Sequence, residues 1–255
     1  MEKVELDYPI SDDEILKLTE FTLQSNKSIK LILMDAISSL PGVRFPWEKV
    51  CNLCRQYNIF SLVDAAHAVT QIPVDISRTQ PDFFVSNLHK WSYVPRGCAV
   101  LYVRRDLQSK VHSLPIGHGY VSSTLPFVTS PVSTSPEGPW VTQHEWPGTI
   151  DWSGYLSVDT AFDFIERCGG GGKIREYCQD LAVKGGERVA EILGTEVLKC
   201  PRTEYTANMV NVRLPLDVPD ETSETYLEQE AAQREAMFDD LFERDCFPYP
   251  YMFHF

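Results

Sequence analysis

Three short apolar runs constrain the fold more than any other feature of the sequence. The first ends at Asp64, the second (82–86) leads into His89 and Lys90, and the third (98–103) follows a Pro-Arg-Gly turn. Runs of this length, bounded by turn residues and rich in β-branched and aromatic side chains, are typical of buried strands. Reactive residues gather at the carboxyl ends of strands in open α/β sheets, so Asp64 and Lys90 are predicted to lie at such ends.

The segments before these runs predict a parallel α/β arrangement. Residues 11–25 begin with a capping-box pattern and continue with apolar side chains at helical spacing, and residues 46–57 have the same spacing. Residues 30–36 lie between the two predicted helices and read as a fully buried strand. Strand, helix and strand at this spacing form the repeating unit of a parallel sheet.

The second half of the chain has a less regular pattern. Residues 107–146 are rich in Pro and Ser and show little periodicity, which is typical of a long functional loop. We expect the glycines at 169–172 to interrupt the helical pattern and act as a flexible joint. The remaining predicted elements are helices over 151–168, 173–193 and 224–244 and a strand over 209–214.

Composition excludes several classes of protein. The net charge of −13 argues against a nucleic-acid partner or an anionic membrane surface, since both need clustered Lys and Arg. No apolar run approaches the length of a membrane span, and the first ten residues lack the apolar core of a signal peptide. Seven cysteines without a secretory signal predict reduced thiols and a cytoplasmic protein.

Cys51 and Cys54 form an isolated CxxC motif. A metal or redox site would need a second ligand pair or a thioredoxin-like context, and neither is nearby in the sequence. We therefore predict that the two thiols are structural, on one helix, and that the chain holds no metal.

Three ordered motifs carry a family resemblance: DAAH at residues 64–67, NLHK at 87–90 and PGTID at 147–151. Together they resemble the fold-type I pyridoxal-phosphate enzymes of the class V aminotransferase and cysteine desulfurase superfamily. The resemblance covers residues 30 to 214, and the most similar branch is the isopenicillin-N-epimerase-like proteins, which include the hercynylcysteine sulfoxide lyases. It implies a PLP-transferase fold with pyridoxal 5′-phosphate as the cofactor.

The resemblance assigns chemistry to three residues. Lys90 matches the lysine that holds the cofactor as a Schiff base, and Asp64 matches the carboxylate that keeps the pyridine nitrogen protonated. His67 matches the residue that contacts the 3′ oxygen of the ring. Each also has a structural interpretation, because Asp64 could cap a strand and Lys90 could be solvated. We favour the functional role for each residue. The position of Lys90 between His89 and Trp91 predicts a side chain that is not freely exposed.

Three further residues match the family's phosphate contacts. Asn87 and His89 flank the lysine where the family helps to hold the phosphate. Thr149 matches a contact that comes from the neighbouring subunit in family dimers. The resemblance therefore implies a homodimer with shared active sites and a small substrate derived from an amino acid.

The motifs also favour one reaction branch. Cysteine desulfurases need a nucleophilic cysteine, but Cys200 and Cys246 lack the glycine-bearing, histidine-flanked loop of that branch. The spacing from Lys90 to the Pro-Arg-Gly turn and the GTIDW segment resemble the epimerase and lyase branch, so we favour a carbon–sulfur lyase. Epimerase, aminotransferase or desulfurase activity, and an inactive relic that acts only by binding a partner, remain as alternatives.

Relative to the family, the chain begins late and ends early. The resemblance implies that the first strands, a phosphate-binding loop, the residue stacked on the ring and the arginine that binds the substrate carboxylate are absent. We therefore expect a partial large domain over residues 1–168, with a mostly parallel sheet and flanking helices, and a partial small α+β domain over 169–255. A sheet that has lost strands would expose apolar surface.

Overall fold

The structure is a computed structural model. It describes residues 2–114, 120, 138–145, 147–198 and 205–215, and isolated positions between 232 and 243. None of the helices in these ranges combines the length and the apolar character needed to cross a bilayer.

The chain forms two compact units. One, which we call the terminal unit, contains residues 1–18, 37–45 and 175–255. The other, which we call the sheet unit, contains residues 19–36 and 46–174. All six predicted site residues belong to the sheet unit.

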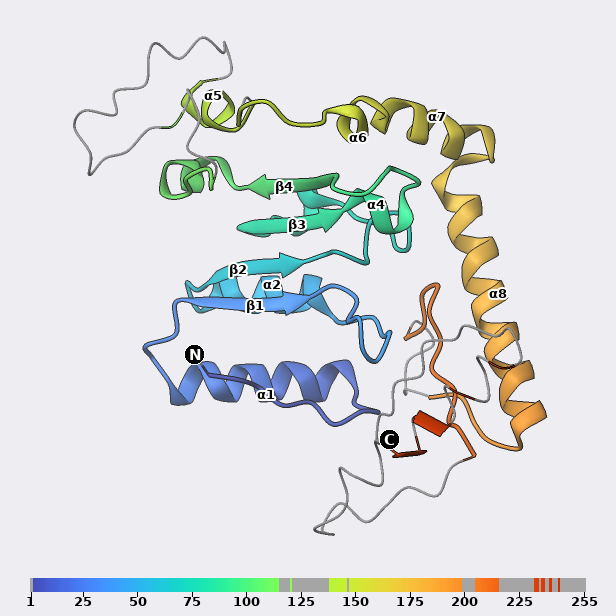
Figure 1. The fold of residues 1–255 in the computed structure, drawn as a ribbon. Helices are drawn as coiled ribbons and strands as arrows, with labels where there is room; N and C mark the ends of the chain where they lie inside the picture. The colour runs from blue at the N-terminus through green and yellow to red at the C-terminus, as the bar shows by residue number, and fades with distance from the viewer. Residues whose placement is uncertain are drawn as a thin grey trace. The chain divides into compact units, whose positions relative to one another are not determined.

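The sheet unit is organised around four strands in the order β1-β2-β3-β4 (Figure 1). β1 pairs with β2 and β2 with β3 in parallel, whereas β4 is antiparallel to β3. The predicted α/β fold with a mostly parallel sheet is therefore confirmed. The strands are β1 Leu31–Asp35, β2 Phe60–Asp64, β3 Phe83–Asn87 and β4 Ala99–Val103.

One face of the sheet is buried beneath α2 (Trp47–Gln56), which passes behind β1 and β2 in Figure 1. The Trp47 ring packs 5.8 Å from the Phe84 ring of β3, measured between centroids. Burial raises the pKa of the Cys51 thiol to about 11 and that of the Cys54 thiol to about 12. The described residues contain no group of three or more His, Cys, Asp or Glu side chains suited to a metal ion. Both thiols are buried residues of α2, as predicted.

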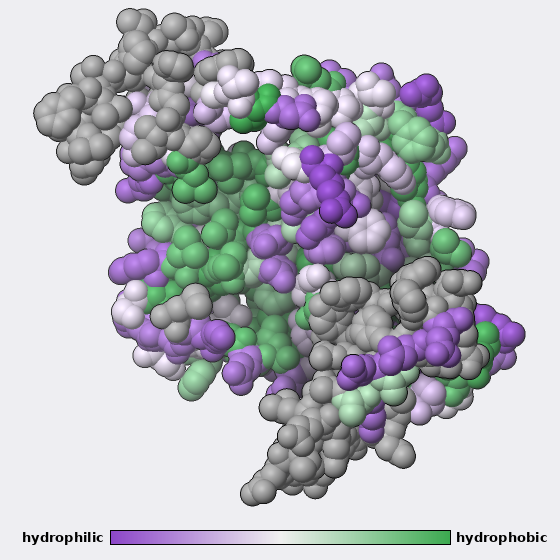
Figure 2. All heavy atoms as spheres, viewed as in Figure 1, coloured by the Kyte–Doolittle hydropathy of each residue, from purple (hydrophilic) through white to green (hydrophobic). Residues whose placement is uncertain are grey.

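The opposite face of the sheet is partly open. Leu31 and Leu33 of β1 are 41% and 62% exposed, and Figure 2 shows hydrophobic side chains gathered over the strands. The prediction of a fully buried strand over residues 30–36 is therefore wrong. Met34 packs on the covered side and is buried, but the residues that alternate with it point to the uncovered side.

The first helix starts where the sequence predicts. Ser11 N donates a hydrogen bond to Glu14 Oε2 (2.9 Å), and Glu14 N donates to Ser11 Oγ (3.3 Å), which is the reciprocal pattern of a capping box. These bonds lower the pKa of the Glu14 carboxyl group. Besides α2, the described helices are α1 Asp12–Ser25, α3 Ile76–Thr79, α4 Leu88–Trp91, the 3-10 helix η1 Arg105–Lys110, α5 Pro139–Glu145, α6 Ser153–Leu156, α7 Val158–Arg167 and α8 Gly170–Leu193.

Three predictions for the second half need correction. The glycines at 169–172 do not form a joint, because α8 already begins at Gly170; only Gly169 and Gly170 adopt positive φ angles, +98° and +87°. The helix predicted over 151–168 is divided into α6 and α7 at Ser157.

The strand predicted over 209–214 is also wrong. This segment pairs with residues 196–198 through two hydrogen bonds, from Leu198 N to Asn211 O and from Arg213 N to Glu196 O, and forms a single bridge. Two bonds are too few for a ladder. Most of the predicted helix over 224–244, like most of the loop over 107–146, lies outside the described residues.

A buried carboxylate fastens the amino ends of β2 and β3. Asp82 Oδ2 accepts hydrogen bonds from Ser61 N (2.7 Å) and Ser61 Oγ (3.0 Å), and Asp82 Oδ1 accepts one from Arg104 Nη1. Arg104 directly follows β4, so one side chain links three strands. Asp82 is 3% exposed, and its bonds satisfy groups that would otherwise be buried without partners.

We expect Asp82→Ala to lower the free energy of unfolding by about 3 kcal/mol, since it leaves buried donors unsatisfied and removes a buried charge from its pair. Urea denaturation would measure the change. Asp106→Ala is the matched control, because Asp106 binds the same Arg104 side chain but is exposed. Equal losses in the two variants would contradict the importance assigned to Asp82.

Candidate active site

The predicted site residues gather where β2 and β3 end. Asp64 is the last residue of β2, and a turn that follows it carries His67. Asn87 is the last residue of β3 and leads directly into α4, which carries His89 and Lys90 (Figure 1). Parallel pairing of β2 and β3 brings the two strand ends together, so both motifs reach the same edge of the sheet.

His67 connects the two motifs. Lys90 Nζ lies 3.2 Å from His67 Nε2, and Trp91 Nε1 donates a hydrogen bond to His67 Nδ1 over 3.1 Å. Burial lowers the pKa of the His67 imidazole, the positive charge of Lys90 lowers it further, and Asp64 opposes both effects. The imidazole is therefore neutral at pH 7.

Lys90 is exposed, contrary to the expectation from its neighbours in the sequence. α4 is a single turn at the end of the sheet, and Leu88 is its one buried residue. The side chain is nevertheless placed by its contact with His67, so the amine is both accessible and held in position.

Two side-chain-to-backbone bonds fix the turn against α4. Gln71 Nε2 donates to His67 O (2.8 Å), and Thr70 Oγ1 donates to Trp91 O (2.6 Å). Gln71 is 3% exposed. The distance from His67 to Lys90 therefore depends on a local framework rather than on two free side chains.

Asn87 and His89 form a second pair at the same edge. His89 Nδ1 lies 2.9 Å from Cys98 O, and a carbonyl can only accept, so Nδ1 carries a proton. In the neutral imidazole the other nitrogen, Nε2, is then an acceptor for Asn87 Nδ2 at 3.3 Å. Both side chains are half-buried, which limits their freedom.

Asp64 has a carboxylate neighbour that the sequence analysis missed. Asp35 ends β1 as Asp64 ends β2, and the register pairs the two residues directly. Asp35 is exposed as a whole residue, but partial desolvation of its carboxyl group raises the pKa of that group, Asp64 raises it further, and Lys90 lowers it. Asp64 Oδ1 also accepts a bond from Ala66 N (2.9 Å), so the strand-cap interpretation holds alongside any other role.

Thr149 belongs to a different segment of the sheet unit. Thr149 is exposed in the segment between α5 and α6, and within the described part of the chain no hydrogen bond joins it to His67 or Lys90. The other five predicted residues lie at the shared strand edge: Asp64, His67, Asn87, His89 and Lys90.

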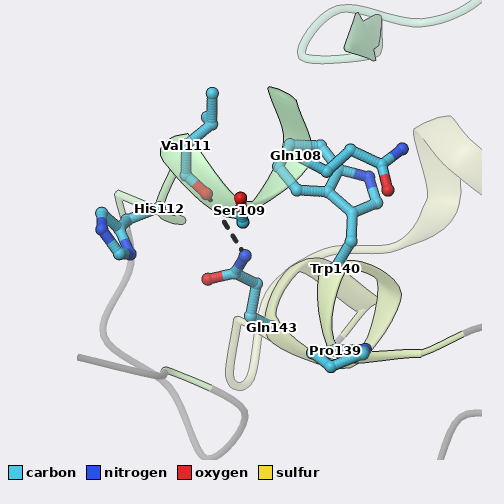
Figure 3. A pocket seen from close by; sticks show the side chains of 7 residues that line it. All are labelled: Gln108, Ser109, Val111, His112, Pro139, Trp140 and Gln143. Carbon is cyan, nitrogen blue, oxygen red and sulfur yellow. Dashed lines mark hydrogen bonds between the residues drawn. The ribbon is translucent and has the colours of Figure 1, made fainter. Parts of the chain in front are cut away.

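A hollow of about 340 Å³ lies elsewhere in the sheet unit (Figure 3). η1 and α5 line it, and Gln143 Nε2 donates a hydrogen bond to Val111 O (3.3 Å) beside it. η1 follows the carboxyl end of β4, and β4 runs opposite to β3. The hollow therefore lies at the other end of the sheet from Lys90, and we assign it no part in the site.

We expect Asp64→Asn to lower two pKa values at once. Asp64 raises the pKa of Asp35 by repulsion between like charges and that of His67 by favouring the imidazolium, so both should fall when its charge is removed. Titration followed by NMR would measure both. The control is Asp75→Asn, whose exposed carboxylate caps α3, and it should move neither value. A pKa of Asp35 or His67 that stays constant in Asp64→Asn would contradict the described electrostatics.

The chain is similar in sequence to proteins of known families. The model of the family described as aminotransferase class-V matches residues 2–234. The chain is 34% identical to hercynylcysteine sulfoxide lyase of Schizosaccharomyces pombe, covering 85% of this chain and 52% of that protein. It is 35% identical to the L-cysteine desulfhydrase-like protein lolT1 of Epichloe uncinata, with the same two coverages. The chain therefore spans about half the length of the curated relatives it matches.

Solved structures show the same fold. The cystine C-S lyase C-DES, in complex with cysteine persulfide, superposes with a TM-score of 0.68 at 16% identity, covering 93% of this chain and 57% of the other. The cysteine desulfurase of Thermococcus onnurineus NA1 superposes with a TM-score of 0.65 at 22% identity, covering 92% and 54%. The resemblance drawn from the three sequence motifs is confirmed: the chain belongs to the aminotransferase class-V family.

Proposed function

We propose that the protein acts in pyridoxal-phosphate chemistry on a cysteine-derived amino acid and cleaves a carbon–sulfur bond. The observation that carries the proposal is the contact of 3.2 Å between Lys90 Nζ and His67 Nε2 beside the Asp64 carboxylate. Relatives named as a hercynylcysteine sulfoxide lyase and as L-cysteine desulfhydrases support a sulfur-containing substrate.

The residues at the sheet edge fit this cofactor. An accessible amine suits an aldehyde, and a half-buried carboxylate suits a protonated pyridine nitrogen. Asp64 uses Oδ1 for Ala66 N, and no described residue donates a hydrogen bond to Oδ2, so one oxygen is available. We propose that Lys90 binds the aldehyde, that Asp64 faces the pyridine nitrogen and that His67 contacts the 3′ oxygen.

We propose that Asn87, His89 and Thr149 form the phosphate site, in which His89 orients the Asn87 amide. The Nδ1–H of His89 is already used by Cys98 O, so the remaining donor of this pair is the amide group of Asn87. Thr149 is exposed, which suits a contact with the phosphate of a neighbouring subunit in a homodimer. We further propose that the large domain covers 1–168 and the small domain 169–255, and that the protein is cytoplasmic, with the described cysteines free.

Within this proposal each side chain has a physical task. When bound, pyridoxal phosphate withdraws electrons from the α-carbon of the substrate, which eases loss of the α-proton and of a sulfur leaving group. The Asp64 carboxylate stabilises the protonated pyridine nitrogen that this withdrawal needs. The Lys90 amine would be the group that takes the α-proton of the substrate. His67 holds that amine in place through Nε2.

We expect borohydride reduction of the chain with pyridoxal phosphate to attach the cofactor to Lys90, because this amine is exposed and positioned by His67. Peptide mapping would locate the label. Lys90→Ala should lose it, whereas Lys110→Ala, which removes an exposed lysine from η1 at the other end of the sheet, should retain it. Labelling spread over many lysines would favour the alternative of an inactive relic that acts by binding a partner.

A substrate panel would separate the reaction branches. We expect cysteine-derived thioethers and sulfoxides to release pyruvate and ammonia, since loss of a sulfur group after removal of the α-proton leaves an unstable enamine. Lys90→Ala should abolish the release. Inversion of the α-carbon without pyruvate would instead indicate an epimerase, and transfer of the amino group to a keto acid an aminotransferase.

A further inference from the structure

We propose that Trp91 is a positioning residue that fixes His67 in the tautomer with its proton on Nε2, so that this proton faces Lys90. The inference deepens the proposed function and rests on it for its role in catalysis. The contacts among Trp91, His67 and Lys90 involve only atoms of this chain and no cofactor atom.

The hydrogen bond from Trp91 determines the tautomer. An indole N–H can only donate, so His67 Nδ1, which receives it at 3.1 Å, must carry a lone pair. A neutral imidazole with a bare Nδ1 has its proton on Nε2. The partner of Nε2 is Lys90 Nζ, at 3.2 Å.

The Nε2 proton of His67 also distinguishes the two forms of the lysine. An ammonium group has three donors and no lone pair, so it cannot receive the Nε2 proton. A neutral amine can. His67 can therefore donate to Lys90 only while the lysine is the neutral amine, which is the form that attacks an aldehyde.

The surroundings of Trp91 hold the indole in place. Thr70 Oγ1 donates to the Trp91 carbonyl over 2.6 Å, and the His67 and Trp91 rings are tilted by 58° with centroids 6.2 Å apart. The charged groups that act on His67 are Lys90, which disfavours the imidazolium, and Asp64, which favours it. Because imidazolium needs a proton on both nitrogens, the bond from Trp91 to Nδ1 also opposes it.

The role follows from this geometry. Without the bond from Trp91, His67 could turn its lone pair towards a protonated Lys90 and hold it in the unreactive form. With the bond, Nε2 keeps its proton and offers no lone pair to a protonated Lys90. Once Lys90 has reacted, the same Nε2 proton is available to another acceptor beside it.

The direct test is the tautomer of His67 in the cofactor-free chain. NMR of ring-labelled histidine, with His67 assigned through His67→Gln, should show Nδ1 bare and Nε2 protonated. Trp91→Phe should increase the population with a proton on Nδ1. The control is Trp140→Phe, since Trp140 contacts the ring of His144 with centroids 4.0 Å apart, near the opposite end of the sheet. A protonated Nδ1 in the parent, or an unchanged tautomer in Trp91→Phe, would overturn the inference.

A second test uses the rate at which pyridoxal phosphate attaches to Lys90 at neutral pH. Trp91→Phe should slow attachment about fivefold, the ratio expected from the loss of one ordinary hydrogen bond. In a His67→Leu background the same substitution should cost nothing further, because Trp91 acts through His67. Additive losses would indicate a merely structural role and would overturn the proposal.

A third variant keeps the test decisive if Trp91→Phe fails to fold. His67→Gln replaces the ring with an amide that always has an acceptor oxygen and a donor NH2 group, so it should retain more of the rate than His67→Leu. Equal rates would count against the tautomer model. If the parent never attaches the cofactor at Lys90, the proposed function fails, whereas the NMR measurement still decides the role of Trp91.

Discussion

The parallel register of β1, β2 and β3 is the constraint on which the rest of this structure depends. It places Asp35 opposite Asp64 and delivers the turn with His67 beside the helix with Lys90. A shift by one residue would send each strand-end side chain to the other face of the sheet. The buried Asp82 carboxylate opposes such a shift, because it binds Ser61 and Arg104 at the amino ends of β2 and β3. The register is therefore held at one end of the sheet, and the candidate site lies at the other.

The fold was predictable where local chemistry decides it. The Ser11–Glu14 capping box and the apolar runs that became β2 and β3 need only neighbours in the sequence to form. The errors arise where burial or strand pairing depends on a segment that is distant in the sequence. Leu33 is apolar but lies on the uncovered side of the sheet, and residues 209–214 have a strand pattern but find a partner of only three residues. Neither what lies over Leu33 nor the length of the segment that pairs with residues 209–214 can be read from the sequence.

The candidate site was also predictable only in part. Strand-end reasoning and family motifs identified Asp64, His67 and Lys90, and the structure brings these three together. Asp35 carries the same signal as Asp64, an acid closing an apolar run, and would have been found by applying the same rule to β1. The role of Trp91 had no such signal, because its bond to His67 depends on how the turn and α4 meet in space.

The two thiols beneath the sheet have a further consequence. Only a thiolate reacts readily with alkylating agents, and the raised pKa values of Cys51 and Cys54 keep both groups protonated at neutral pH. Both residues are also 0% exposed, so a reagent reaches them only when α2 leaves the sheet. The protein thus contains its own pair of reporters, whose reaction rate registers transient opening of the layer that supports the candidate active site.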